Sequence, residues 1–548
     1  MNRKLGIVGA AGIVAGLMLA SAPAQAQSSA PSPAARTHVA AYVPPPIAWG
    51  PCSSSTLQQF GAQCGMLTVP LDYAHPAGTK IQLAVSRVTH TTPSSQYQGV
   101  VLVNPGGPGG SGLVYSIFQS FIPNDGGMSY DWIGFDPRGV GSSVPSLTCD
   151  GNYFGFNRPS FVPVNERVEH AWLVKTRNYT RACKAAGGAL LEHLKTTDSV
   201  ADMESIRIAL GQSKINYYGF SYGTYLGQVY ATLHPNRVRR FILDSNVDPR
   251  RVWYQANLDQ DYAFDKNLGI YLNWVAAHDS SYHLGTSGAA LLRTYYRVLN
   301  RLRTHPQAGG LVGPDEWTDA IVPAAYYVYG WDTTAQAIAA AVNGGDFTAI
   351  RDLYVSSTGG QGPGADNGYA VYLAVQCSDV RWPQAWSTWE RDNNRVYSRA
   401  PFLTWDNAWY NAPCRGWGAK PGTPVTVNGQ RSPAMLLVDE TNDAATPYAG
   451  SLYVRSIFPK SVLIEGVGGT THAGSLSGVA CTDDKIAAYL ATGALPKRVS
   501  GNRSDVQCAP VPPPTPTVAA ATASRKATTK PARVGTLRQV LGPIGRDR

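Results

Sequence analysis

Short apolar runs alternate with helical patterns through the first half of the chain. Residues 198–211 place Met203, Ile206 and Leu210 at the spacing of one helix face. A second helix is expected directly after residue 221. Runs rich in β-branched and aromatic residues predict strands within 65–73, 80–90, 99–104, 129–136, 214–220 and 238–246. The alternation of strands and helices is typical of an α/β fold, a mostly parallel sheet with helices on both faces.

The pattern changes at about Arg251. Long helical segments rich in Trp and Tyr, such as 262–278 and 289–305, continue to about Gln430. Strands then return within 432–443 and 461–469, and a helix follows. The simplest organisation is therefore a sheet domain formed by 46–250 and 431–510 and interrupted by a mainly helical cap over 251–430.

The first 45 residues are predicted to lie outside this body. Arg3 and Lys4 precede an apolar run, and Ala24-Gln25-Ala26 has the small-x-small pattern of a signal peptidase site. We therefore expect a signal peptide, residues 1–26, a Ser, Pro and Ala-rich linker over 27–45, and a secreted, extracellular protein. An uncleaved membrane anchor is the alternative for this N-terminal segment. No later stretch of the sequence is apolar and long enough to span a bilayer.

The net charge of +10 is concentrated at the two ends of the chain. Residues 511–548 contain seven Lys or Arg and one Asp, and the signal region adds two basic residues, so the body is nearly neutral. This distribution argues against nucleic acid as a partner, because no basic stripe interleaved with aromatic residues runs through the body. The tail is rich in Pro, Ala and Thr and is predicted to be disordered. Weak association with an anionic cell wall stays open.

The cysteines are even in number and fall into four pairs that are local in sequence. In an oxidising compartment this indicates disulfide bonds rather than a metal site, and no C-x-x-C pair is present. The predicted pairs are Cys52 with Cys64, Cys149 with Cys183, Cys377 with Cys414, and Cys481 with Cys508.

Ser221 lies between Gly219 and Gly223 at a predicted junction of strand and helix. The pattern G-x-S-x-G there is typical of a serine nucleophile on a sharp turn, where the flanking positions must be glycine for steric reasons. A glycine-bounded turn without chemistry is the alternative.

A serine nucleophile needs a base and an orienting acid, in the chain order Ser, Asp or Glu, His. Asp443 follows a predicted strand, and His472 lies in a glycine-rich loop after the next strand. Asp439 and Glu440 are rivals for the acid, although they lie nearer the strand interior. A helix cap for Asp443 and a loop position without a role for His472 are the alternatives.

The glycine run after the strand at 99–104 has two interpretations. Gly107, Gly109 and Gly112 satisfy G-x-G-x-x-G, the pattern of a dinucleotide-binding loop. The preferred interpretation is an oxyanion loop, whose glycines let a backbone N–H approach a substrate carbonyl. Gly106 or Gly107, together with Tyr222, would then stabilise the oxyanion. No cofactor and no metal is expected.

Taken together, "VNPGGPGGSG", "DWIGFDPRGVGSS", "YYGFSYGTYLG", "NDAATP" and a histidine before "CTDDKIAAYL" resemble the secreted bacterial tripeptidyl aminopeptidases. These are relatives of prolyl iminopeptidase with the α/β-hydrolase fold, and the resemblance covers most of residues 46–508. It implies Ser221 as nucleophile, Asp443 as acid and His472 as base. One departure is "GGTTHAG", because relatives commonly have glycine directly before the histidine.

The resemblance also implies peptide or protein substrates with free N-termini. A carboxylate must then face the substrate ammonium, because an unpaired buried charge is costly. The candidates are Asp261, Asp265, Asp379 and Glu440. Two other functions stay open: a secreted carboxylesterase with the same three residues, and a non-catalytic protein associated with the cell wall.

Overall fold

The computed structural model describes residues 42–517. The predicted signal peptide, most of the linker, and residues 518–548 of the predicted tail lie outside this range. The described strands form one ten-stranded sheet in the order β1-β2-β3-β5-β4-β6-β7-β8-β9-β10. Their bounds are β1 Gly50–Pro51, β2 Gln63–Pro70, β3 Lys80–Val88, β4 Val100–Asn104, β5 Asp131–Phe135, β6 Ile215–Phe220, β7 Val238–Asp244, β8 Leu436–Glu440, β9 Val462–Gly466 and β10 Val506–Cys508.

The sheet is antiparallel at one edge and parallel elsewhere. Strands β1, β2, β3 and β5 pair antiparallel in turn, and every pairing from β5 through β4 to β10 is parallel. In a parallel region all strands end at one edge, so the loops that follow them lie close together. Ser221 and the loops containing Asp443 and His472 follow β6, β8 and β9.

Helices cover both faces of the sheet, as the alternation of side chains along β4 requires. Val100 and Leu102 belong to the same core cluster as residues of α3 (Thr196–Ala209) and α4 (Tyr222–Leu233). Val101 and Val103 belong to another, with residues of the 3₁₀ segment Leu113–Phe121 and of α15 (Ala480–Thr492). Buried on both faces, β4 is apolar at four successive positions, Val100 to Val103.

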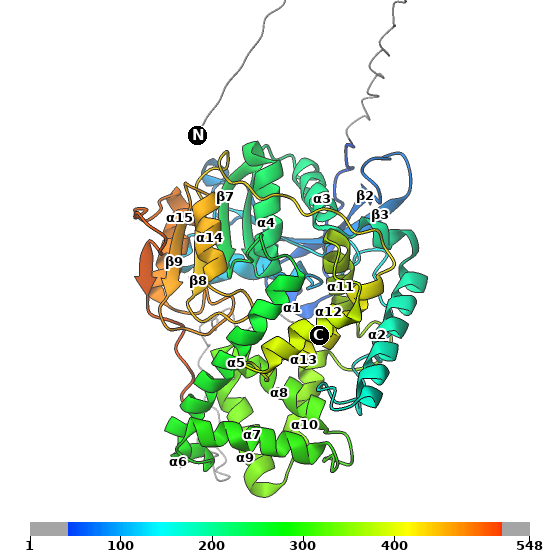
Figure 1. The fold of residues 1–548 in the computed structure, drawn as a ribbon. Helices are drawn as coiled ribbons and strands as arrows, with labels where there is room; N and C mark the ends of the chain where they lie inside the picture. The colour runs from blue at the N-terminus through cyan, green and yellow to red at the C-terminus, as the bar shows by residue number, and fades with distance from the viewer. Residues whose placement is uncertain (1–41, 518–548) are drawn as a thin grey trace, which may run out of the picture. The chain divides into compact units, whose positions relative to one another are not determined.

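A helical region separates β7 from β8, within the predicted insertion. Figure 1 shows its helices, green to yellow, gathered beside the sheet, and those of its first half share a core of their own. Their bounds are α5 Tyr254–Ala277, α6 Asp279–Tyr282, α7 Gly288–Leu302, α8 Pro314–Tyr326, α9 Trp331–Gly344, α10 Thr348–Thr358, α11 Asn367–Asp379, α12 Trp386–Tyr397 and α13 Thr404–Asn411.

Other helices lie outside this insertion. Besides α3, α4 and α15, they are α1 (Ser55–Gln59), α2 (Glu166–Gly187) and α14 (Ala449–Ile457). The sequence analysis did not identify α2, which precedes β6 but packs against the second half of the insertion. Trp172 of α2 stacks on Trp409 of α13 with ring centroids 5.6 Å apart, and the Thr180 hydroxyl donates to the Pro413 carbonyl at 3.0 Å. The helical layer is thus built from two separate parts of the chain.

Four disulfide bonds join the pairs of cysteines that the sequence predicts: Cys52–Cys64, Cys149–Cys183, Cys377–Cys414 and Cys481–Cys508. The third connects the end of α11 to the segment after α13, and the fourth connects α15 to β10. Two of the four therefore fix helices to elements that follow them closely in sequence.

The body extends past the predicted boundary at residue 510. The Val511 N–H donates to Glu440 at 2.6 Å, and the Thr517 N–H and hydroxyl donate to Asp332 on α9. Residues 511–517 are therefore not part of a free tail. Within residues 42–517, no helix combines the length and the apolar character needed to cross a membrane.

Candidate active site

Ser221 occupies a strained turn between β6 and α4. Its φ of 56° and ψ of −125° lie in a region that L-residues rarely adopt. A Cβ on Gly219 would lie 2.5 Å from the Gly223 carbonyl oxygen, and one on Gly223 would lie 2.6 Å from the carbonyl oxygen of Asn104. Both flanking positions therefore require glycine, which is the steric reason that the sequence pattern suggested.

Asp443 and His472 meet at the same edge of the sheet. The His472 Nδ1 lies 2.7 Å and 3.0 Å from the two carboxylate oxygens of Asp443, and both side chains are buried. Asp443 also accepts hydrogen bonds from the Ala445 N–H at 2.9 Å and from the N–H and hydroxyl of Thr446 at 3.0 Å. These donors fix the carboxylate in the orientation that receives the imidazole N–H.

The electrostatics distinguish Asp443 from its two rivals. Burial alone would raise the pKa of Asp443, but the charge of His472 and hydrogen bonds from His472, Ser245 and Thr446 hold it below the ordinary value. Burial and the neighbouring Asp443 charge raise the pKa of Asp439 well above its ordinary range. Burial also raises the pKa of Glu440, to about 8. Asp443 is thus the carboxylate of the three that stays ionised beside His472.

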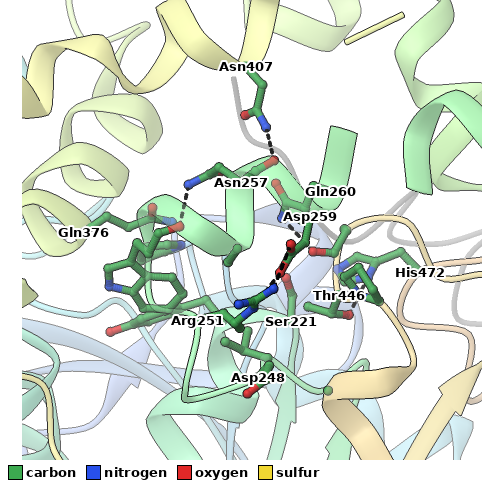
Figure 2. Close-up of a pocket in the computed structure, with 18 of the residues that line it drawn as sticks. Ser221, Asp248, Arg251, Asn257, Asp259, Gln260, Gln376, Asn407, Thr446 and His472 are labelled. Atoms are coloured by element: carbon green, nitrogen blue, oxygen red, sulfur yellow. Dashed lines mark hydrogen bonds and ion pairs between the residues drawn. The ribbon is translucent and has the colours of Figure 1, made fainter. Parts of the chain in front are cut away.

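Ser221 and His472 line one cavity of about 650 Å³. Figure 2 shows it between the loops at the sheet edge and the helices of the insertion. Its walls are polar as well as aromatic, with Trp253, Tyr326 and Tyr372 among the lining residues. Within the described part of the chain, no group of three or more His, Cys, Asp or Glu side chains is arranged to hold a metal ion.

The glycine loop after β4 lies against Ser221, and its glycines differ in what they contact. The Gly106 N–H donates to the Asn104 side-chain oxygen at 3.0 Å, so this amide is already used. Gly107 and Tyr222 line the cavity, and Tyr222 is the first residue of α4, where helix amides have no partner inside the helix. A Cβ on Gly109 would lie 2.2 Å from the Gly368 carbonyl oxygen, so this glycine allows close packing against α11.

None of the four carboxylates predicted to face the substrate amine lines the cavity. Asp261 accepts from the Asn407 amide at 3.0 Å, and Asp265 accepts from the Phe402 N–H at 3.2 Å. Glu440 accepts from the backbone N–H groups of Thr471 and Val511. Asp379 accepts from Thr196 and from the Trp253 indole, so it lies one side chain behind the cavity wall.

Among the described residues, the carboxylates on the cavity wall are Asp248 and Asp259. Both are paired: Asp248 with Arg250 at 2.6 Å, and Asp259 with Arg251 at 2.8 Å. The sequence analysis missed them. Asp248 follows the end of β7, where the parallel strands end, and this position is the signal that could have found it; Asp259 lies in α5 and has no such signal.

Comparisons with known proteins agree with the fold. The family model described as alpha/beta hydrolase fold matches residues 99–472. The chain is 41% identical over 480 residues to "Tripeptidyl aminopeptidase" of Streptomyces coelicolor, covering 86% of this chain and 87% of that protein. It is 30% identical over 478 residues to "Serine protease Hip1" of Mycobacterium tuberculosis, covering 82% and 90%. It is also 30% identical over 525 residues to "Carboxylesterase B" of the same species, covering 91% and 96%.

The sheet topology and the family match define an α/β-hydrolase, and the named relatives support a serine hydrolase. Within that class, the chain belongs to the tripeptidyl aminopeptidase family.

Proposed function

We propose that this protein is a secreted serine exopeptidase that releases short peptides, most simply tripeptides, from the free N-termini of peptides and proteins. The observation that carries the proposal is the buried Asp443–His472 pair, 2.7 Å apart, which shares one cavity with the strained Ser221. The name of the Streptomyces relative supplies the substrate class.

The proposed reaction is acyl transfer through three residues of the chain. Ser221 Oγ attacks the scissile carbonyl carbon while His472 takes its proton, and Asp443 orients the imidazole and stabilises its charged form. The amides of Gly107 and Tyr222 stabilise the oxyanion, with Gly106 shaping the loop. His472 then protonates the leaving amine, and water attacks the acyl-enzyme to regenerate Ser221.

A carboxylesterase is the second candidate, because the relative named "Carboxylesterase B" matches 91% of this chain. The same three residues hydrolyse esters, and the fold alone does not decide the substrate. A non-catalytic role in the cell wall is disfavoured, because a buried Asp–His pair beside a strained serine is costly to keep without chemistry.

Export through the predicted signal peptide and weak cell-wall association through the basic tail belong to the same proposal. Four disulfide bonds in the described residues support an oxidising compartment. Fractionation of a culture of the producing cells, with the protein's N-terminus sequenced, tests both points. Mature protein in the medium that begins at Gln27 is the expected result.

The catalytic proposal is tested with purified protein and the Ser221→Ala variant. The substrates are Ala-Pro-Ala-p-nitroanilide with a free and with an acetylated N-terminus, and a short p-nitrophenyl ester. We expect fluorophosphonate labelling and cleavage of the free-amine peptide, with both lost in the variant. Turnover of the ester alone, or equal cleavage of both peptides, would replace the exopeptidase assignment by an esterase or an endopeptidase.

A further inference from the structure

Gln376 lines the active-site cavity, and the oxygen of its side-chain amide has no hydrogen-bond partner among the described residues. The side chain is 5% exposed, and its Oε1 atom is buried without a hydrogen-bond partner in the described structure. Leaving a buried carbonyl oxygen unpaired costs about 1–3 kcal/mol, and a turn of the side-chain amide would present this oxygen to a donor in the filled cavity. A bound substrate is the donor that the cavity itself admits.

The reaction geometry says which end of the substrate passes Gln376. His472 protonates the leaving amine, so the leaving peptide lies on the His472 side of Ser221. The acyl portion, which contains the substrate's N-terminus, extends the other way. Figure 2 shows Gln376 and His472 on opposite sides of the cavity, with Ser221 between them in this view. Gln376 therefore belongs to the wall that an N-terminal segment would meet.

The electrostatics of that wall favour a cation. Gln376 and Asp379 lie in the last turn of α11, where the aligned peptide dipoles give the helix end a partial negative charge. The buried Asp379 carboxylate accepts hydrogen bonds from neutral donors, namely the backbone and hydroxyl of Thr196 and the indole of Trp253. Trp253 lines the cavity and its indole donates to Asp379, so this carboxylate lies directly behind the Trp253 side chain.

The two carboxylates on the cavity wall itself are less suited to this role. Asp248 and Asp259 each form an ion pair with an arginine, and their side chains are 15% and 32% exposed. An ammonium there would compete with a guanidinium already in place, in a region that water screens. The end of α11 offers a negative charge that has no cationic partner among the hydrogen bonds of Asp379.

We propose that the α-ammonium of the substrate binds beside the C-terminal end of α11, where the Gln376 side-chain oxygen accepts its hydrogen bond and Asp379, behind Trp253, supplies the opposing charge. This assignment rests on the proposed exopeptidase function. It identifies the site whose distance from Ser221 would determine the length of the released peptide. The separation between Gln376 and Ser221 then sets how many residues are released.

The test uses the full-length protein with Gln376→Met and Gln376→Glu, and Gln336→Met as the matched control at an exposed position of α9 in the cap. Rates are measured on free and N-acetylated Ala-Pro-Ala-p-nitroanilide, and fluorophosphonate labelling reports an intact active centre. Gln376→Met should lower kcat/KM on the free peptide about 10- to 100-fold, mainly through KM, without slowing the labelling. Gln376→Glu, which keeps an acceptor and adds a charge, should retain or increase the preference for the free amine, and the control should match the parent.

The outcomes separate the two proposals. If the parent protein does not prefer the free amine, the exopeptidase function fails. If the parent prefers it and Gln376→Met behaves like the parent, the amine site is not at α11. Loss of the preference in Asp259→Asn or Asp248→Asn instead would place the ammonium at the paired carboxylates. Loss of activity in Gln376→Glu with labelling retained would mean that Gln376 donates to a substrate carbonyl, which also overturns the assignment.

Discussion

At the scale of single residues, Asp443 and Asp439 show how position decides the chemistry of a carboxyl group. They lie four positions apart and are both buried, yet one receives the His472 imidazole and the other a hydroxyl of Ser451. The difference is that β8 ends at Glu440, so Asp443 lies in the loop that follows β8. This loop lies beside the end of β9 and beside the loop that follows β9, which contains His472. Asp439 still lies inside the strand.

Replacing Asp443 by Asn should therefore abolish most of the activity. The amide cannot hold the tautomer of His472 that accepts the Ser221 proton, so kcat should fall about 10⁴-fold with little change in KM. Steady-state kinetics on the free-amine peptide measures both parameters. Asp439→Asn is the matched control: its carboxyl is already held neutral by burial, so activity should stay within a few-fold of the parent. An equal loss in the two variants would contradict the assignment of the acid.

The order of Ser221, Asp443 and His472 could be predicted from sequence because each follows a strand whose pattern is clear. The residues around the proposed site of the substrate amine could not be predicted from the sequence. Asp261 was a candidate and Asp259 was not, although they are two positions apart on α5. Two positions correspond to about 200° around a helix, so the two side chains face different neighbours. Only the packing of the helix shows which of them meets the cavity.

At the scale of elements, the loop that contains His472 is held by three buried carboxyl groups. Glu440 accepts from the Thr471 N–H at 2.5 Å, Asp244 from the Ser475 N–H at 2.9 Å, and Asp483 from the Leu476 and Gly478 N–H groups at 2.8 Å. These acceptors come from β8, β7 and α15. The loop has little regular structure of its own, so its shape depends on them.

Glu440→Gln should loosen this loop and move His472, the proposed base. Glutamine can accept one of the two backbone hydrogen bonds, from Thr471 or Val511, but presents an NH₂ group to the other donor. We expect a loss of about 1–3 kcal/mol in unfolding free energy and a lower kcat with KM nearly unchanged. Denaturant unfolding and steady-state kinetics measure the two effects. A variant with the parent's stability would show that the loop does not depend on Glu440.

The pH dependence of stability should change in the same variant. The pKa of Glu440 is raised by burial from 4.5 to about 8, so the folded protein binds this proton more tightly than the unfolded chain does. The resulting stabilisation is fully present below pH 4.5 and is lost as the pH rises through 8. Between pH 6 and 8 the free energy of unfolding of the parent should therefore fall more steeply than that of Glu440→Gln. Asp379 and Asp483 have pKa values of about 6, so these two groups titrate mostly below this window and contribute little to the slope within it. Parallel profiles across the window would contradict the raised pKa.

Helix α2 is an element that the sequence pattern did not predict. Its buried residues include Trp172, Thr176, Tyr179 and Cys183, which follow the spacing of one helix face. The pattern was present, but two of the four residues are polar or small, and the long stretch after β5 contains no strand to mark its place. Strands such as β4 and β6 are continuous apolar runs between glycines and polar turns, and so they could be identified.

At the scale of the whole molecule, the insertion between β7 and β8 could be predicted because the alternation of strands and helices stops and later resumes. How its helices pack against the sheet could not be predicted, since the contacts join segments that lie far apart in the sequence. Gly109 against Gly368, and Asp379 against Thr196, are contacts of this kind. The cavity exists only where these distant segments converge, which is why its lining had to come from the structure.

The Cys377–Cys414 disulfide connects this architecture to the proposed specificity. It joins the last turn of α11, which contains Gln376 and Asp379, to the segment after α13 across a separation of 37 residues. Replacing both cysteines by Ala should lower the unfolding free energy by about 2–4 kcal/mol. The end of α11 should also move more freely, so discrimination between free and acetylated peptide should weaken.

The matched control is the double Ala variant of Cys52 and Cys64, a disulfide with a separation of 12 residues at the sheet edge far along the strand order from β8. It should lower stability while leaving the discrimination unchanged, because neither cysteine lies on the cavity wall. Thermal unfolding and kcat/KM on the two peptides, measured well below the unfolding transition, separate the effects. If both variants lose discrimination in proportion to their stability, the effect is global loosening, and the disulfide at α11 has no special part in holding the amine site.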